Sequence, residues 1–452
     1  MGADDDLERL AASVVAFGFD GHARPTDGDA AGEVQLPAHA ERMIDRGCAV
    51  CVLFSRNVED ASTSAAKGDW EALCAALKRR AWPNKLALAV DQEGGRVRRL
   101  RHGTLADTPS AEVLGRVVED EIVAADGKPE GKSKGMRTIG HHAIATASEL
   151  RAVHIDWNLA PCADIASNPD GPIAKSGRSF SSKPEVVARC CQVFVHHHQS
   201  NGVACCAKHF PGIGACAEDT HVALPLLPPP HSYHEYAKAG AFGVDRRIPG
   251  ARAGRTCGEF PVPFYPFCIA SDADVAAIMV SHAAMGWDGV TPASMSFTVV
   301  TSLLKGIRTK GVTLPSPFNR DWPGVRGVSK KFSGLVCCDD LEMGGALKAT
   351  GGSVGDAAVR SIKAGCDLLL VCHTERAQAE AIDAIVKAAR ESRYVRSRLE
   401  DAANRVAAFV EAWAEEVPPR KAEEATRVAV IAGNAEDRAR VKAILLSAGG
   451  NA

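Results

Sequence analysis

The stretch KHFPGIGACAEDTH, residues 208 to 221, carries several groups that could do chemistry. It begins with Lys208 and His209, passes through glycine-bearing turns, and ends with Asp219 and His221, two positions apart. A carboxylate this close to a histidine can hold the imidazole and tune it as a proton donor or acceptor. A lone loop histidine is usually only solvated, but the neighbouring aspartate and the glycine-rich context favour an acid/base role for His221.

A second candidate lies in the segment LVCCDDLEM, where Asp339 directly follows the apolar run Leu335–Cys338. A carboxylate at the end of a buried strand, among arginine and lysine side chains, is expected to stay ionised and can attack an anomeric carbon. The structural alternative is that an aspartate here caps the following helix, and Asp340 is an equally good candidate for that role. The two segments together predict cleavage of a bond at an acetal carbon.

Polar residues also follow several other apolar runs of the chain. In a barrel of parallel strands, the loops that follow the strands converge at one mouth. The residues concerned are Asp91, Glu93, Arg96, Arg99, Asp164, Arg178, Lys208, His209, Ser281, His282, Asp339 and Asp340. We expect them to form a charged ring around that mouth. The alternative is a purely structural network in which carboxylates and arginines neutralise each other.

The elements that would position these residues are short apolar runs that alternate with helical patterns. Buried parallel strands are continuous and apolar, without alternation. The runs are Ala12–Phe17, Ala49–Phe54, Leu86–Val90, Trp157–Ala160, Gly202–Ala207, Ala277–Val280, Leu335–Cys338 and Leu368–Val371, and the clearest helices are Trp70–Arg80, Pro184–His198 and Ala377–Arg390. The pattern predicts an α/β fold, a (β/α)8 TIM barrel, with a doubly wound sheet as the alternative.

Residues 1–417 are expected to form one catalytic domain with insertions in its loops. Glu119–Arg137, Pro228–Glu259 and Lys310–Lys331 are long connections without periodicity, as is typical of functional rims or of mobile segments. The pair Pro418–Pro419 breaks the last helix. The tail, residues 418–452, has too few apolar residues for a domain of its own, so we expect it to pack on the barrel or to be mobile.

Composition limits the kinds of partner and the cellular compartment that are expected for this protein. The net charge of −2 gives no electrostatic case for nucleic acid or an acidic membrane, so a small-molecule ligand is expected. The 15 cysteines lie in apolar runs, and we expect them to be reduced core residues. The acidic start, MGADDDLERL, does not resemble a secretory signal, and no apolar run could span a membrane. The sequence therefore predicts a soluble cytoplasmic protein.

Neither a metal nor a cofactor is expected. Consecutive helix positions point in different directions, so His196, His197 and His198 cannot converge on one ion. The GIG at positions 212–214 is only a fragment of a nucleotide-binding fingerprint, and the chain has no Walker loop.

Several of these segments match a known family. KHFPGIGACAEDTH resembles the KHFPGHG-x4-D-[ST]-H signature of the NagZ-like β-N-acetylglucosaminidases of glycoside hydrolase family three. DQEGGRVRR, GRSF, NLAPCADI, CDDLEMGGA, VLFSRN and AGCDLLLVC also look like their counterparts in that family. The resemblance covers roughly Val14 to Val371, apart from the three insertions, and does not include the tail.

The resemblance implies a retaining mechanism with a covalent glycosyl-enzyme intermediate. The nucleophile would be Asp339 and the acid/base His221, with Asp219 as its partner, in place of the usual pair of carboxylates. The residues expected to bind the hydroxyls and acetamido group of an N-acetylglucosaminide substrate are Asp91, Arg99, Arg178, Lys208 and His209.

The chain departs from the family pattern at two positions. Cys338 replaces the usual serine before the nucleophile, and Ile213 replaces the second histidine of KHFPGHG. The predicted activity is hydrolysis of terminal β-linked N-acetylglucosamine from small glycosides. Two alternatives stay open: a phosphorylase that uses the same site, and a non-catalytic sugar-binding barrel.

Overall fold

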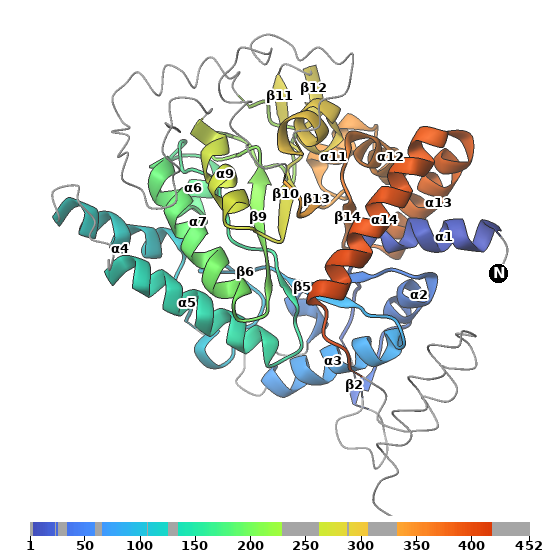
Figure 1. Cartoon of the computed structure of the whole chain (residues 1–452), viewed down its shortest axis with the longest axis horizontal. Coiled ribbons are helices and arrows are strands. Elements are labelled where there is room, and N and C mark those ends of the chain that lie inside the picture. The colour runs from blue at the N-terminus through green and yellow to red at the C-terminus, as the bar shows by residue number, and fades with distance from the viewer. Residues whose placement is uncertain are drawn as a thin grey trace, which may run out of the picture.

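The computed structural model describes residues 3–22, 24–25, 34–58, 66–105, 107–124, 134–227, 262–286, 289–305 and 332–417. Parallel strands close into a barrel in the order β1-β14-β13-β10-β9-β8-β5-β4 (Figure 1). Their bounds are β1 Val15–Phe17, β4 Val50–Leu53, β5 Ala87–Val90, β8 Trp157–Asn158, β9 Ala204–Phe210, β10 Ala277–Val280, β13 Leu335–Cys338 and β14 Leu368–Val371. Because β1 pairs with both β14 and β4, the sheet has no edge. The predicted (β/α)8 barrel is confirmed, and the doubly wound alternative is excluded.

Every residue of the barrel strands is buried, because side chains fill the barrel interior on one face of the sheet and helices cover the other. Cysteines take part in this core as small apolar residues. Cys205, Cys206, Cys337 and Cys338 are buried free thiols within the strands, as predicted. Burial raises the pKa of the Cys205, Cys337 and Cys338 thiols well above the ordinary value and that of Cys48 to about 12, so these thiols stay protonated at neutral pH.

Helices surround the barrel in Figure 1. Their bounds are α1 Ala3–Ser13, α2 Ala38–Arg46, α3 Ala66–Ala81, α4 Ala111–Ala124, α5 Lys134–Arg151, α6 Pro172–Lys175, α7 Pro184–Gln199, α9 Tyr265–Asp272, α11 Gly344–Ala349, α12 Val354–Ala364, α13 Glu375–Glu391 and α14 Arg393–Trp413. A π-helical stretch covers Thr298–Leu304. The three helices predicted from the sequence correspond to α3, α7 and α13. In the part of the chain that the structure describes, no helix is both long and apolar enough to span a bilayer.

Two predicted strand boundaries, at Ala12 and Ala207, are wrong by three residues, and the other boundaries agree with the structure within two residues. Ala12 belongs to helix α1, and the strand begins only at Val15, because the apolar residues before it pack as a helix against α13 and α14. Strand β9 extends to Phe210 and therefore includes Lys208, which was expected to follow the strand. It extends because its neighbours continue the pairing: the N–H of Lys208 donates to the carbonyl of Pro161, and Phe210 pairs with β10.

The insertion predicted at Glu119–Arg137 is helical at both ends, since α4 continues to Ala124 and α5 begins at Lys134. The insertions predicted at Pro228–Glu259 and Lys310–Lys331, and the tail 418–452, lie outside the described residues.

Short antiparallel hairpins accompany the barrel: β2 Arg24–Pro25 with β3 Val34–Gln35, β6 Gln92–Gly94 with β7 Val97–Arg98, and β11 Ala284–Gly286 with β12 Gly289–Pro292. The β6–β7 hairpin directly follows β5 and carries Glu93 into the barrel mouth. Gly94 in this hairpin has a φ of 96°, and an added Cβ would lie 2.3 Å from the carbonyl oxygen of Pro109. The hairpin therefore needs glycine at this position.

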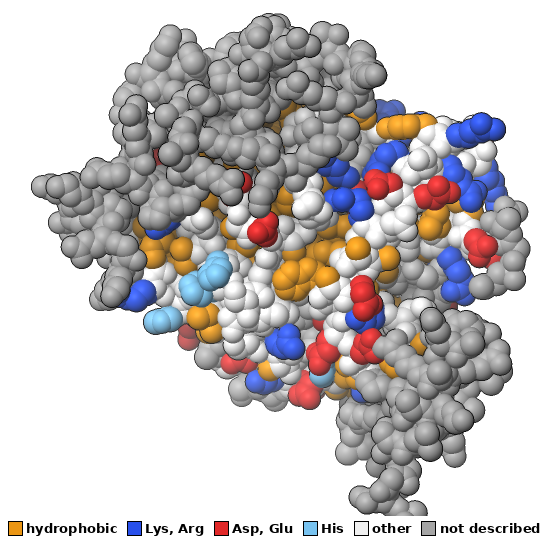
Figure 2. Space-filling model, viewed as in Figure 1, with side chains coloured by type: hydrophobic (Ala, Val, Ile, Leu, Met, Phe, Trp, Pro, Cys, Tyr) orange, Lys and Arg blue, Asp and Glu red, His pale blue; other side chains and the backbone are white. Residues whose placement is uncertain are grey.

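Charged side chains on the face shown in Figure 2 are of both signs and are interspersed. The three consecutive histidines of α7 have different surroundings. His198 is buried, stacks on Phe194 and contacts the carbonyl of Ala143 through Nδ1, whereas His196 and His197 contact each other edge to face.

Candidate active site

The polar residues that follow the strands form one connected network at the barrel mouth. Asp91 accepts hydrogen bonds from Nζ of Lys208 at 2.6 Å and from Nη2 of Arg99 at 3.1 Å. Nζ of Lys208 also lies 2.7 Å from Oε1 of Glu93. Glu93 in turn accepts two hydrogen bonds from Arg178, at 2.9 and 2.7 Å. Carboxylates and cations therefore alternate along this network. Its residues come from the loop after β5, from β9 and from the loop before α7.

The electrostatics of this network keep its carboxylates ionised. Burial alone would raise the pKa of Asp91, but the charges of Lys208 and Arg99 outweigh it and lower that pKa below its ordinary value. Burial acts in the same way on Glu93, and Arg178 and Lys208 lower its pKa to about 2. Nε of Arg99 is buried and has no hydrogen-bond partner within the described ranges. A buried donor without a partner is what a site for a polar ligand leaves open.

His209 joins the network at its other end. Its Nε2 lies 3.2 Å from Nη2 of Arg178, and its Nδ1 lies 2.7 Å from Oδ2 of Asp164. The five residues predicted to bind substrate, namely Asp91, Arg99, Arg178, Lys208 and His209, are thus brought together. Sequence reasoning placed Glu93 and Asp164 in the ring but gave neither a role, although both are buried links of this network.

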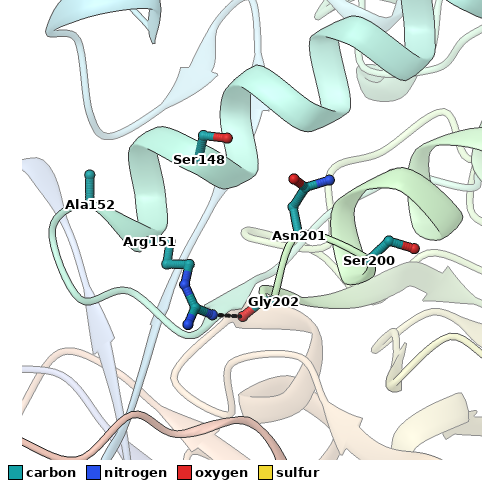
Figure 3. A pocket seen from close by; sticks show the side chains of 6 residues that line it. All are labelled: Ser148, Arg151, Ala152, Ser200, Asn201 and Gly202. Atoms are coloured by element: carbon teal, nitrogen blue, oxygen red, sulfur yellow. Dashed lines mark hydrogen bonds between the residues drawn. The ribbon is translucent and has the colours of Figure 1, made fainter.

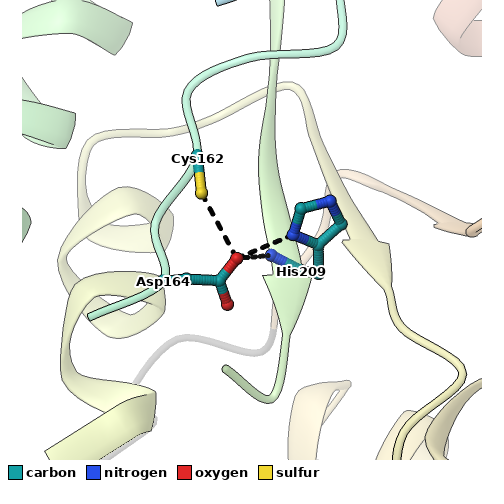
Figure 4. Close-up of side chains that lie close together, drawn as sticks. All are labelled: Cys162, Asp164 and His209. Carbon is teal, nitrogen blue, oxygen red and sulfur yellow. Dashed lines mark hydrogen bonds and ion pairs between the residues drawn. The ribbon is translucent and has the colours of Figure 1, made fainter. Parts of the chain in front are cut away.

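Cys162, Asp164 and His209 offer three possible metal ligands whose atoms lie within 4.8 Å of one another (Figure 4). Thiolate, carboxylate and imidazole are groups that zinc accepts. Here the thiol of Cys162 donates to Oδ2 of Asp164 at 3.3 Å, and burial raises its pKa well above the ordinary value. The thiol of Cys162 and the imidazole of His209 are therefore both engaged in hydrogen bonds with Asp164.

The two aspartates that follow β13 have different surroundings. The carboxylate of Asp340 is nearly buried, accepts from the N–H of Glu342 at 3.0 Å and lies 3.1 Å from Nε2 of His373. Oδ1 of Asp339 accepts only from the next main-chain N–H, and its Oδ2 has no hydrogen-bond partner in the described part of the chain. Asp340 is thus held by two neighbours, whereas one carboxylate oxygen of Asp339 keeps no partner among the described residues.

Three polar residues near Asp339 complete this side of the mouth. His282 contacts the carbonyl of Asp340 through Nε2 and the hydroxyl of Ser294 through Nδ1. His373 was missed by the sequence analysis, although it directly follows the run AGCDLLLVC and so meets the criterion that identified the others. Ser281 is buried, and its hydroxyl has no hydrogen-bond partner among the described residues. It follows β10, which lies between β9 and β13.

Asp219 and His221 form the predicted couple. Nδ1 of His221 lies 2.7 Å from Oδ1 of Asp219, and the same oxygen accepts the main-chain N–H of His221 at 2.9 Å. The side chain of His221 is 64% exposed, so its Nε2 is left to exchange protons. Burial alone would raise the pKa of Asp219, but the hydrogen bonds from His221 and the charges of His221 and Arg178 outweigh it and lower that pKa.

The loop that carries this couple packs tightly at both ends. At its start, the N–H of Ile213 donates to Oδ1 of Asp164 at 2.7 Å, and a Cβ on Gly214 would lie 1.7 Å from the carbonyl oxygen of Ile165. At its end, the N–H of Gly344 donates to the carbonyl of His221 at 2.9 Å. This last contact joins the loop of His221 to the segment that follows Asp339.

Two hollows lie at the opposite end of the barrel, where the strands begin. Figure 3 shows one of about 730 Å³ between the end of α5 and the turn after α7, where Arg151 donates to the carbonyl of Gly202. A cleft of about 340 Å³ lies between the starts of β10 and β13 and helix α14. Neither contains a residue of the candidate site.

The chain matches a family model, and it is similar to curated proteins of the same kind. Residues 33–238 and 260–409 match the model described as the glycosyl hydrolase family 3 N terminal domain. A β-hexosaminidase of Xylella fastidiosa (strain M23) is 33% identical over 332 residues, which cover 73% of this chain and 78% of the relative.

Solved structures also resemble this chain. A glycoside hydrolase family 3 β-N-acetylglucosaminidase from Paenibacillus sp. str. FPU-7 is 27% identical, with a TM-score of 0.67 and 90% of this chain covered. This chain spans 62% of the length of that structure. A β-N-acetylhexosaminidase from Beutenbergia cavernae DSM 12333 is 25% identical, with a TM-score of 0.64, and the match covers 90% of this chain and 98% of the other.

Proposed function

This chain belongs to glycosyl hydrolase family 3 and is a glycosidase, and on that premise we propose that it is a retaining β-N-acetylglucosaminidase. Its substrates would be small glycosides with a terminal β-linked N-acetylglucosamine. The relatives named β-hexosaminidase and β-N-acetylglucosaminidase support the choice of sugar. The fixed donors and acceptors from Asp91 to His209 support a site that selects a polyhydroxylated ligand.

The observation that carries the proposal is the hydrogen bond between Gly344 and His221. It holds an Asp–His couple against the segment that follows an available carboxylate, Asp339, beside the polar network. A glycosidase that forms a covalent intermediate needs these three parts: a nucleophile, a proton donor and fixed groups that hold the sugar.

In the proposed mechanism, the carboxylate of Asp339 attacks the anomeric carbon. His221 donates the proton of Nε2 to the oxygen of the leaving group as the glycosidic bond breaks. The product is released, and the sugar stays bound to Asp339 as an ester. His221 then takes a proton from a water molecule, which attacks the same carbon and frees Asp339. Two inversions leave the configuration retained.

Water is the better-supported acceptor of the sugar than phosphate. A neutral His221 would not repel a phosphate dianion, and Lys208 and Arg178 could attract one. However, Lys208 lies within 2.7 Å of two carboxylates, and Arg178 is paired through two hydrogen bonds with Glu93. Because carboxylates already neutralise these two cations, they would attract a phosphate dianion only weakly. A phosphorylase is therefore the second candidate.

A panel of chromogenic glycosides tests the proposal. We expect N-acetylglucosaminide to be cleaved much faster than glucoside or N-acetylgalactosaminide, and we expect free N-acetylglucosamine to be released at a rate that millimolar phosphate does not change. Comparable cleavage of the plain β-glucoside would contradict the specificity. Faster turnover that yields sugar 1-phosphate would favour the phosphorylase, and no turnover of any glycoside would favour the non-catalytic barrel.

A further inference from the structure

Ser281 is held through its main chain, but its side chain makes no hydrogen bond to any described residue. Its N–H donates to the carbonyl of Phe210 at 2.8 Å, and its carbonyl accepts the N–H of Ser294 at 3.0 Å. The side chain is fully buried, and its hydroxyl has no partner within the described ranges. Most buried polar atoms do have a partner. At the mouth of a candidate active site, such an exception indicates a partner that comes into reach only during the reaction.

The side chain of Asp339 points into the barrel. This orientation follows from Cys337, two positions earlier in the same strand. Sγ of Cys337 in β13 lies 3.8 Å from Sγ of Cys206 in β9, although β10 separates the two strands. Side chains from strands that are not neighbours can meet in this way only inside a barrel, where they converge. Since side chains alternate along a strand, Asp339 has the same orientation as Cys337.

Ser281 is the neighbour of Asp339 on the adjacent strand and points to the same side. Val280 pairs with Cys338 in the ladder between β10 and β13. The ladder continues one position further, since the N–H of Asp339 donates to the carbonyl of Val280 at 2.9 Å. The next pair in register is therefore Ser281 and Asp339. Paired residues of parallel strands point to the same face, and the strands are about 4.8 Å apart.

The order of the strands places Ser281 between the proposed nucleophile and groups proposed to hold the sugar. β10 lies between β13, which precedes Asp339, and β9, which carries Lys208 and His209. In this structure, Oδ1 of Asp339 accepts the N–H of Asp340, and Oδ2 keeps no partner in the described part of the chain. To attack a sugar held by Lys208 and His209, the carboxylate must turn toward β9. This movement brings it over Ser281.

We propose that Ser281 is a positioning residue for the nucleophile, and that its hydroxyl donates to the carboxylate of Asp339 when this carboxylate turns toward the anomeric carbon. The inference rests on the proposed function, since it needs Asp339 as the nucleophile. A carboxylate held at one oxygen can still rotate, whereas two donors fix its plane. It has about four lone-pair sites, so the N–H of Asp340 and the hydroxyl of Ser281 leave enough of them for the attack.

The contact is gained only as the reaction proceeds, because the hydroxyl has no partner beforehand among the described residues. An interaction that is stronger in the transition state than in the resting enzyme accelerates the reaction. The same reasoning predicts that loss of the hydroxyl slows the reaction without weakening the fold.

Ser281→Ala therefore separates this role from a structural one. It removes a buried hydroxyl that lacks a partner, so we expect an unchanged or slightly higher thermal unfolding midpoint. The kcat/KM for N-acetylglucosaminides should nevertheless fall about tenfold or more. Ser361→Ala is the matched control, since Ser361 in α12 is also fully buried and its hydroxyl also lacks a partner within the described residues. This control should leave kcat/KM unchanged. Wild-type kcat/KM in Ser281→Ala would refute the proposal.

A second pair of variants separates the hydroxyl of Ser281 from its volume. Ser281→Thr keeps a hydroxyl, whereas Ser281→Val has nearly the same shape without one. Both carry the added methyl group, so its cost is common to the two. We expect the threonine variant to be about tenfold faster in kcat/KM than the valine variant. Equal rates in this pair would contradict the assignment.

The choice of substrate distinguishes a contact with Asp339 from a contact with the sugar. A contact with the nucleophile serves every substrate, so Ser281→Ala should lower kcat/KM by the same factor for good and poor leaving groups. It should also slow the labelling of Asp339 by a mechanism-based fluorosugar. The factor should stay the same for analogues that each lack one hydroxyl or the acetamido group. If the loss disappears for a single analogue, Ser281 binds the missing group of the sugar, and the proposal is overturned.

Failure of this inference differs from failure of the proposed function. If Asp339→Asn is inactive while Ser281→Ala keeps the wild-type kcat/KM, only the role of Ser281 is refuted. If the wild-type protein cleaves none of these glycosides, or if Asp339→Asn remains fully active, the proposed mechanism fails and the role of Ser281 fails with it.

Discussion

Nε2 of His373 lies 3.1 Å from Oδ2 of Asp340, so a histidine after β14 is paired with the carboxylate next to the proposed nucleophile. The hydrogen bond to Asp340 raises the pKa of His373 above its ordinary value, against the opposing effect of partial burial. A raised pKa in the folded state means that the protonated ring stabilises the fold fully below pH 6.5, and that this contribution is lost as the pH rises through the raised value.

We therefore expect a proton NMR titration of His373 to give a pKa above 6.5 in the wild type. Asp340→Asn removes the main cause and should lower that pKa. Glu342→Gln is the matched control, since the Glu342 carboxylate accepts from the main-chain N–H of His373 and contributes less to the shift. An equal decrease of the pKa in both variants would show that Asp340 is not the dominant partner.

Asp339→Asn should remove the proposed nucleophile while the fold is kept. We expect kcat to fall on the order of 10³-fold or more, with an unchanged thermal unfolding midpoint. A mechanism-based fluorosugar should label Asp339 in the wild-type enzyme, as read by mass spectrometry of peptides. Labelling of Asp340 together with an active Asp339→Asn variant would refute the assignment.

His221→Ala should remove the proposed acid/base. With poor leaving groups we expect a loss of about 10²- to 10⁴-fold, whereas good leaving groups need little protonation and should keep their first step. Azide should then restore turnover and give a β-glycosyl azide. Equal losses for good and poor leaving groups would mean that His221 serves only to maintain the loop.

Gly344→Ala should displace the Asp219–His221 couple, although Gly344 lies outside the loop that carries it. A Cβ on Gly344 would lie 2.8 Å from the main-chain carbon of Val222 and 2.9 Å from the carbonyl oxygen of His221. We expect the His221 loop to shift, with a larger loss of kcat for poor leaving groups than for good ones. Gly68→Ala is the matched control, because a Cβ there meets nothing within 4 Å and its helix should become slightly more stable. Unchanged kinetics in Gly344→Ala would show that this contact does not position the couple.

The buried ion pair between Lys78 and Asp156 should dominate stability at the other end of the barrel. Nζ of Lys78 lies 2.6 Å from Oδ2 of Asp156, and both side chains are almost fully buried. Lys78→Met leaves an unpaired buried carboxylate, so we expect the free energy of unfolding in urea to fall by about 3–5 kcal/mol. Lys85→Met breaks a pair with the exposed Glu411 and should cost at most about 1 kcal/mol. Similar losses in the two variants would contradict this expectation.

Local composition determined the architecture and most of the members of the site. A strand that is buried on both faces is apolar along most of its length, so each barrel strand could be identified from its own residues. Because parallel strands of a barrel end at one mouth, the polar residues that follow them could be expected to meet there. The boundary of α1 could not be found in this way, since the apolar residues before Val15 suit a buried helix as well as a strand.

Tertiary contacts decided which of two adjacent aspartates is held by neighbours and which groups face the two ring nitrogens of His209. Asp339 and Asp340 are identical side chains one position apart. Among their described contacts, His373, from the segment after β14, and the main-chain N–H of Glu342, two positions along the chain, distinguish Asp340. The surroundings of the His209 ring depend in the same way on Asp164 and Arg178, which lie 45 and 31 positions away in the chain. Hydrogen-bond polarity is a property of a group and its neighbours in space, so a sequence can name the residues of such a network but not the direction of its hydrogen bonds.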